Sequence, residues 1–234
     1  MKLPCLMPRT VLTVLLLSSP FFASAAPDTG IPLSVGDDYS YVTTRWGQGD
    51  YTLTCLPDGS GAPLSTARDS AGNPVDCTIH VYLLSPENVP YVGVPAEMIG
   101  VWARHLTNGL YGCGAAAAGD HIILAHADRP TDANGYTTIS GPLAVGGCTA
   151  AYPDGLDLIV VQPGPGGAID WPHGTLGIIS PDLFTDGVVD LSDVFLFSDL
   201  YGSHDGRADF DANGIVGISD LIVFSGAVGV ACGP

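Results

Sequence analysis

Oxygen-bearing side chains recur at fixed intervals in a twelve-residue stretch near the C-terminus. Asp209, Asp211 and Asn213 stand at its first, third and fifth positions, and Asp220 stands at its twelfth. Ca²⁺ binds six to eight oxygens, and a loop of this length supplies them from alternate side chains and from the carbonyl at the seventh position, here Ile215. A glycine at the sixth position permits the sharp bend that such a loop needs. These residues predict a calcium site.

A second copy of this pattern lies 27 residues earlier, from Asp182 to Asp193. Its third position is Phe184, which cannot bind a metal, but its ninth position adds a carboxylate that the other copy lacks. We therefore expect weaker calcium binding, or a bound water in place of the missing ligand. The predicted ligands are Asp182, Asp186, Val188 through its carbonyl, Asp190 and Asp193.

The two copies form an internal repeat that continues beyond the loops, because residues 182–202 align with residues 209–229 without a gap. Apolar residues follow each loop and predict a short helix there. Pro181 precedes the first loop and a Gly-rich segment precedes the second, so no helix is expected before either loop. Each unit should therefore be a loop followed by one helix.

This duplicated loop and helix over roughly residues 180–230 resembles the type I dockerin, a small calcium module that binds cohesin domains on bacterial surfaces. The resemblance implies two Ca²⁺ ions, a partner that is a cohesin-like or other extracellular protein, and partner contacts at Leu191-Ser192 and Ile218-Ser219. The basic residues that often follow in the helix of the family are absent. Two other interpretations remain open: Asp/Gly-rich turns that bind no metal, and calcium that only stabilises the fold.

The first 25 residues have the pattern of an export signal. Lys2 and Arg9 supply positive charge, an apolar run follows, and Ala23-Ser24-Ala25 offers a cleavage site. No later stretch reaches about 18 apolar residues, so no transmembrane anchor is expected in the mature chain. These features predict a secreted or cell-surface protein.

The chain is strongly acidic, with seven basic and 24 acidic residues and a formal net charge of −17. Loss of residues 1–25 removes two basic residues and no acidic ones, which leaves −19. Nucleic-acid binding requires Lys and Arg to neutralise phosphates, so it is not expected here. An anionic membrane surface would also repel this chain.

Five cysteines follow the export signal. Their wide spacings argue against a zinc site, and an exported chain can oxidise them. Sequence order suggests Cys55–Cys77 and Cys113–Cys148, although four cysteines allow three pairings. Cys232 would then be free, bonded to another chain, or bonded to one of those four in place of its suggested partner.

Residues 36–162 are typical of a β domain. β-Branched and aromatic residues alternate with polar ones in short runs between Gly/Pro/Asn/Asp clusters, and this pattern favours a sandwich. The expected strands cover residues 51–55, 77–84, 97–103, 121–126, 136–140 and 156–161.

Within this region, Val89-Pro90-Tyr91-Val92-Gly93-Val94-Pro95 and Thr131-Asp132-Ala133-Asn134-Gly135-Tyr136-Thr137 resemble the entry strand and hairpin of the invasin-type bacterial immunoglobulin-like domain. Such domains serve as spacers, adhesion modules or polymer binders. The Asp132–Gly135 segment repeats the letters of the second calcium loop, but its first and twelfth positions would be Pro130 and Gly141. We therefore interpret it as a hairpin turn.

The sequence thus predicts a mostly β, non-catalytic protein in four parts: a signal peptide (1–25), an immunoglobulin-like β-sandwich (26–162), a Pro/Gly linker (163–176) and a dockerin-like module (177–234). No nucleophile elbow, phosphate loop or paired metal-binding histidines are present. Two alternatives are an adhesin or carbohydrate-binding protein in which calcium is structural only, and an extracellular hydrolase of unfamiliar type.

Overall fold

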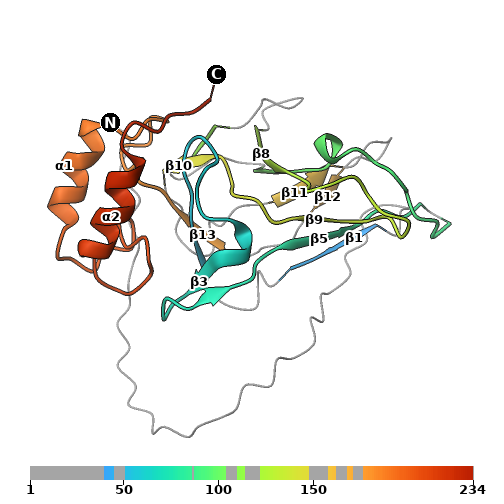
Figure 1. Cartoon of the computed structure of the whole chain (residues 1–234), viewed down its shortest axis with the longest axis horizontal. Helices are drawn as coiled ribbons and strands as arrows, with labels where there is room; N and C mark the ends of the chain where they lie inside the picture. The colour runs from blue at the N-terminus through green and yellow to red at the C-terminus, as the bar shows by residue number, and fades with distance from the viewer. Residues whose placement is uncertain are drawn as a thin grey trace, which may run out of the picture.

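The computed structural model describes residues 40–44, 51–85, 87–103, 110–113, 122–147, 158–161, 168–170 and 176–233. In these parts of the chain the structure is mostly β, as predicted, with short strands and two ten-residue α-helices. The helices lie side by side at one end of the molecule, and the strands lie beyond them (Figure 1). The predicted signal peptide falls outside the described residues.

The strands are two to five residues long, and they group into small sheets. Their bounds are β1 (Tyr41–Thr43), β2 (Tyr51–Thr54), β3 (Ala67–Asp69), β4 (Pro74–Val75), β5 (Ile79–Tyr82), β6 (Gly100–Ala103), β7 (Leu110–Gly112), β8 (Ile122–His126), β9 (Tyr136–Ile139), β10 (Val145–Gly147), β11 (Leu158–Val161), β12 (Ala168–Asp170) and β13 (Leu176–Ile179). The sheet orders are β1-β5-β9, β10-β7, β12-β11-β6-β8 and β13-β2-β3-β4. Two 3₁₀ turns lie between strands: η1 (Leu64–Thr66) follows β2 and η2 (Ala96–Met98) follows β5.

All six expected strand regions contain a strand, namely β2, β5, β6, β8, β9 and β11. Strand β5 shows why the alternating pattern works. Ile79 and Val81 are buried in the main core, while His80 and Tyr82 are half-exposed on the other face. Tyr82 stacks on Tyr41 across the β1–β5 pair, with ring centroids 4.5 Å apart. The immunoglobulin-like topology itself stays a prediction.

The two segments behind the immunoglobulin-like resemblance contact each other. The Thr131 hydroxyl donates to the Tyr91 carbonyl at 2.6 Å and accepts from the Val94 amide at 2.9 Å. The turn that follows is held by Asp132, whose carboxylate accepts from the Asn134 and Tyr136 amides. Strand β9 begins directly after this turn, so no calcium loop forms here.

Helices α1 (Leu191–Leu200) and α2 (Ile218–Ala227) follow the two predicted calcium loops, as expected. The side chain of Asp190 caps α1 by accepting from the Ser192 amide at 2.7 Å. Each helix is followed by a glycine with positive φ, Gly202 and Gly229. A second core forms between the two units, around Val189, Phe197, Phe210, Val216 and Phe224.

The two loop–helix repeats together form the C-terminal unit, which is joined to the β domain through β13. Strand β13 pairs with β2 in parallel. Residues 176–179, which the sequence places where the linker meets the module, are therefore part of a sheet. The Cys55 amide donates to the Ile179 carbonyl at 2.8 Å, one residue beyond the last pair of that ladder. Of the predicted linker, residues 163–167 and 171–175 lie outside the described residues, and β12 pairs with β11.

A disulfide joins Cys113 of the β domain to Cys232 near the C-terminus. The pairing of Cys113 with Cys148 expected from sequence order is therefore wrong, and Cys148 lies outside the described residues. The expected Cys55–Cys77 bond is also not formed, although both residues are buried. Order along the chain misled because the bond connects residues 119 positions apart, which only the tertiary fold brings together.

The described residues contain no helix with the length and apolar character needed to cross a bilayer.

Candidate metal centre

The second loop gathers three carboxylates into one small space. Asp209, Asp211 and Asp220 each offer an oxygen, and these oxygens lie within 4.8 Å of one another. Among the described residues no other such group of three or more His, Cys, Asp or Glu side chains forms. Three carboxylates at this separation could hold a metal ion, and hard oxygens of this kind suit Ca²⁺.

Backbone amides hold the carboxylates of this loop in place. Asp209 accepts from the amides of Asn213 at 3.0 Å and Gly214 at 2.9 Å. Asp220 accepts from the amides of Asp211 at 3.2 Å and Gly217 at 2.8 Å. The first and last acids of the loop are therefore turned inward by the loop's own backbone.

The first loop has the same hydrogen-bond pattern at equivalent positions. Asp182 accepts from the amides of Asp186 and Gly187, and Asp193 accepts from those of Phe184 and Asp190. The backbone agrees as well, with positive φ at the fourth and sixth positions of both loops: Thr185, Gly187, Ala212 and Gly214. The two loops thus adopt the same backbone conformation although their sequences differ at several positions.

The loops differ where the sequence differs. Phe184, at the third position of the first loop, is 60% exposed and adds no ligand. Asp190, the predicted ninth-position ligand, uses its carboxylate to cap α1. Asp182, Asp186 and Asp193 do not form a group as tight as the one in the second loop. The structure therefore brings the predicted ligands of the second loop together more closely than those of the first.

The seventh-position residues Val188 and Ile215 are placed alike, since each donates its amide to the side chain at the fifth position, Asp186 or Asn213. Calcium ligation by their carbonyls stays a prediction.

Each loop also pairs with the end of the other unit. The Val189 amide donates to the Val230 carbonyl, and the Gly229 amide donates to the Val189 carbonyl, both at 2.8 Å. The equivalent bonds link Val216 to Ser203 at 2.9 Å and to Gly202 at 2.8 Å. This reciprocity makes the two units a single pseudo-symmetric pair, in which neither loop is complete without the other unit.

Burial disfavours the charged form of several of these acids. It raises the pKa of Asp182 to about 6, and it also raises the pKa of Asp193 and Asp209 despite hydrogen bonds from backbone amides that act the other way. Burial acts on Asp211 too, but hydrogen bonds from Ser219 and Asn213 bring its pKa below the usual value. A divalent cation would relieve the cost of holding these carboxylates close together and away from water.

The first loop also contacts the β domain. Asp182 is fully buried, and its carboxylate lies against Gly146 of β10, where no side-chain atom would fit. The Gly147 amide donates to the Asp182 carbonyl at 3.1 Å. At the middle of the loop, the Cys232 amide donates to the Gly187 carbonyl at 2.8 Å. The first loop is thus held between β10 and the disulfide-bonded tail.

Large apolar side chains are exposed at equivalent positions of the two helices. Leu191 and Ile218 are 65% and 64% exposed, and Phe195 and Ile222 are 65% and 66% exposed. Each helix carries its two residues at i and i+4, on one face. The dockerin resemblance had pointed to Leu191 and Ile218. The repeat alignment contained the signal for Phe195 and Ile222, but sequence alone did not show which apolar residues would stay exposed.

Comparison with family models, with curated proteins and with solved structures gave no match for this chain.

Proposed function

We propose that the C-terminal unit is a calcium-dependent docking module of the dockerin type, which attaches a secreted, non-catalytic β domain to a cohesin-like protein outside the cell. Calcium would stabilise the paired loops and thereby fix the two helices relative to each other. Ligands in the second loop would be Asp209, Asp211, Asn213, Asp220 and the Ile215 carbonyl. In the first loop they would be Asp182, Asp186, Asp193, the Val188 carbonyl and, if its capping bond is released, Asp190.

The observation that carries this proposal is the matched exposure of apolar side chains on α1 and α2. Four large apolar residues that are about two-thirds exposed are costly to leave in water. Phe197 and Phe224 are buried between the two repeats, whereas Leu221 and Val223 of α2 are partly exposed, at 38% each. Exposed apolar side chains that gather on one face of a well-packed helix pair mark a surface that binds another molecule.

The first experiment asks whether calcium binds and stabilises the chain. Calcium titration of the mature protein by calorimetry should show saturable binding. Calcium at about a hundredfold over its dissociation constant should add about 2.7 kcal/mol to the free energy of unfolding. If melting in calcium and in chelator is identical, the proposal is wrong.

The second experiment tests docking on a panel of cohesin domains by surface plasmon resonance. The double variant F195S/I222S should weaken binding about tenfold or more, because exposed anchors of this size dominate such interfaces. A matched control is V92S, which removes an apolar side chain that is 63% exposed in the β domain. Calcium binding without any cohesin binding would favour the alternative in which calcium only stabilises the fold.

A further inference from the structure

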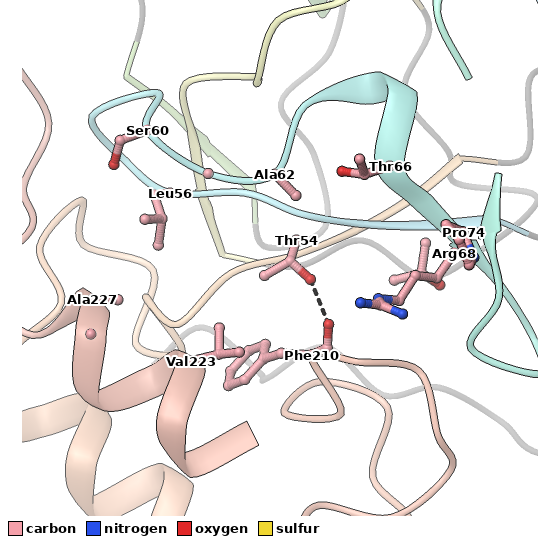
Figure 2. A pocket seen from close by; sticks show the side chains of 13 residues that line it. Thr54, Leu56, Ser60, Ala62, Thr66, Arg68, Pro74, Phe210, Val223 and Ala227 are labelled. Atoms are coloured by element: carbon pink, nitrogen blue, oxygen red, sulfur yellow. Dashed lines mark hydrogen bonds between the residues drawn. The ribbon is translucent and has the colours of Figure 1, made fainter. Parts of the chain in front are cut away.

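A cleft of about 450 Å³ lies between the β13-β2-β3-β4 sheet and the C-terminal unit (Figure 2). Its sheet side carries hydroxyl groups from Thr52, Thr54, Ser60 and Thr66, and its other side is apolar, with Phe210 and Val223. The Thr54 hydroxyl donates to the Phe210 carbonyl at 2.8 Å and joins the two sides. A volume of this size is in the range of small-ligand sites.

Arg68 is the one charged residue among those that line the cleft. It pairs with Thr52 across β2 and β3, so its side chain shares a face with the threonine hydroxyls. Figure 2 shows its guanidinium extending into the space between Thr54 and the segment that carries Phe210. A molecule that enters the cleft would therefore lie close to the positive charge of Arg68.

Most of the hydrogen-bonding capacity of Arg68 is unused by the described residues. Its Nη1 donates to the Gly72 carbonyl at 2.7 Å, and no described carboxylate forms an ion pair with it. A guanidinium has five N–H donors and stays charged at all relevant pH values. A lone cation of this kind, in a chain with a net charge of −17, is complementary to an anionic group on a ligand.

We propose that this cleft binds an acidic sugar of one or two rings, with the carboxylate of a uronic acid on Arg68. A sugar ring has hydroxyls that both donate and accept. The hydroxyls of Thr54, Ser60 and Thr66 already donate to Phe210, Asp58 and Pro63, so their oxygens can accept hydrogen bonds from a sugar. It also has an apolar face of C–H groups, which would lie toward Phe210 and Val223. A carboxylate on such a ring completes the match, since Arg binds carboxylates with two parallel hydrogen bonds.

This inference does not depend on the docking role, but Phe210 on the wall of the cleft lies in the second predicted calcium loop, so the experiments below are made in saturating calcium. The cleft belongs to the sheet and to the outer side of the loop–helix unit, and the proposed cohesin contacts are the exposed side chains of α1 and α2. A mature chain that binds no cohesin could still bind the sugar, and the reverse also holds, so failure of one proposal is distinguishable from failure of the other.

The test uses calorimetry on the mature, full-length chain with digalacturonate as the probe. Digalactose, which has the same ring stereochemistry without the carboxylates, and the dipeptide Glu-Glu, which has carboxylates without the sugar, are measured in parallel. Digalacturonate should bind at least about tenfold more tightly than either, because the loss of one charge-assisted contact is worth about that factor.

Two variants test the position of the ligand. R68A should reduce the affinity for digalacturonate about tenfold or more, while R129A, which removes the same charge from a site beside Tyr136 on another sheet, should leave it unchanged. G226L should block the cleft without unfolding α2, because a Cβ at Gly226 meets no atom within 4 Å and Leu favours a helix more than Gly does. S225L places the same bulk on the neighbouring position, outside the lining, as its control.

Equal binding of digalactose or of Glu-Glu would overturn the assignment to an acidic sugar. Unchanged affinity in both R68A and G226L would overturn the assignment to this cleft. Absence of digalacturonate binding at millimolar concentration would overturn the proposal as a whole. Melting curves of each variant in the absence of ligand separate a loss of binding from a loss of fold.

Discussion

Phe197 of α1 and Phe224 of α2, which occupy the same position in the two repeats, stack on each other with ring centroids 4.8 Å apart and an interplanar angle of 23°. Both rings are almost fully buried, at 3% and 2% exposure. The contact lies on the pseudo-symmetry axis that also relates the Val189 and Val216 backbone pairs. The two sequence repeats therefore pack against each other in the structure, and each contributes its equivalent phenylalanine to the buried contact.

Truncation of one ring should destabilise the C-terminal unit strongly. We expect F224A to lower the free energy of unfolding by about 3–5 kcal/mol, because it removes buried apolar surface and leaves a cavity beside Phe197. Urea unfolding in calcium measures the change. F195A, which truncates a ring that is 65% exposed, is the matched control and should shift stability by no more than about 0.5 kcal/mol. Similar losses in both variants would contradict the burial of Phe224 against Phe197.

Removal of one loop carboxylate should separate the two proposed calcium sites. D220N leaves the side-chain size unchanged but takes away a charge from the tightest group of acids, so the affinity of the second loop should fall at least about tenfold. Calorimetry should then show one site where the original chain shows two. D199N removes an acid from the exposed side of α1 and should change neither site. An unchanged calcium isotherm for D220N would mean that the second loop does not bind the ion.

The pH dependence of the calcium-free chain follows from the buried acids of the loops. Burial raises the pKa of Asp182 to about 6, whereas an unfolded Asp has a pKa near 3.9. Between these values the folded chain binds a proton that the unfolded chain has lost, so the free energy of unfolding should decrease as pH rises from about 4 to about 6.

Urea unfolding of the calcium-stripped protein at pH 4.5 and pH 7 measures this slope, and D182N should make it shallower because its side chain does not titrate. Asp193 and Asp209, whose pKa values are also raised by burial, should keep part of the effect. In saturating calcium the slope should reverse, because the ion binds the deprotonated carboxylates. A calcium-free chain that becomes more stable between pH 4.5 and pH 7 would contradict the burial of these charges.

The parts of the fold that were predicted correctly are those that local sequence determines. The acids from Asp209 to Asp220 that the structure brings together lie within one loop, and the apolar run behind them specifies the helix that follows. The alternation in β5 is likewise local. The contact of Asp182 with Gly146, and the cleft beside Arg68, depend instead on segments far apart in the chain. No period or motif links such segments, so the sequence alone offered no signal for either feature.

The Cys113–Cys232 bond is the clearest long-range feature of this kind, and it supports a last prediction. It closes a loop between residues 119 positions apart, so its loss should raise the conformational entropy of the unfolded chain considerably. The double variant C113S/C232S should be less stable by about 2–4 kcal/mol.

Loss of this bond should also free the C-terminal tail, whose Cys232 amide donates to the Gly187 carbonyl of the first loop. Calcium binding should therefore weaken more in the first loop than in the second. Thermal melting of the original chain and of the double variant, each with and without reductant, measures the loss of stability. Calorimetry measures the loss of calcium affinity. If reductant changes the melting temperature of the double variant as much as that of the original chain, some other bond is responsible for the stabilisation.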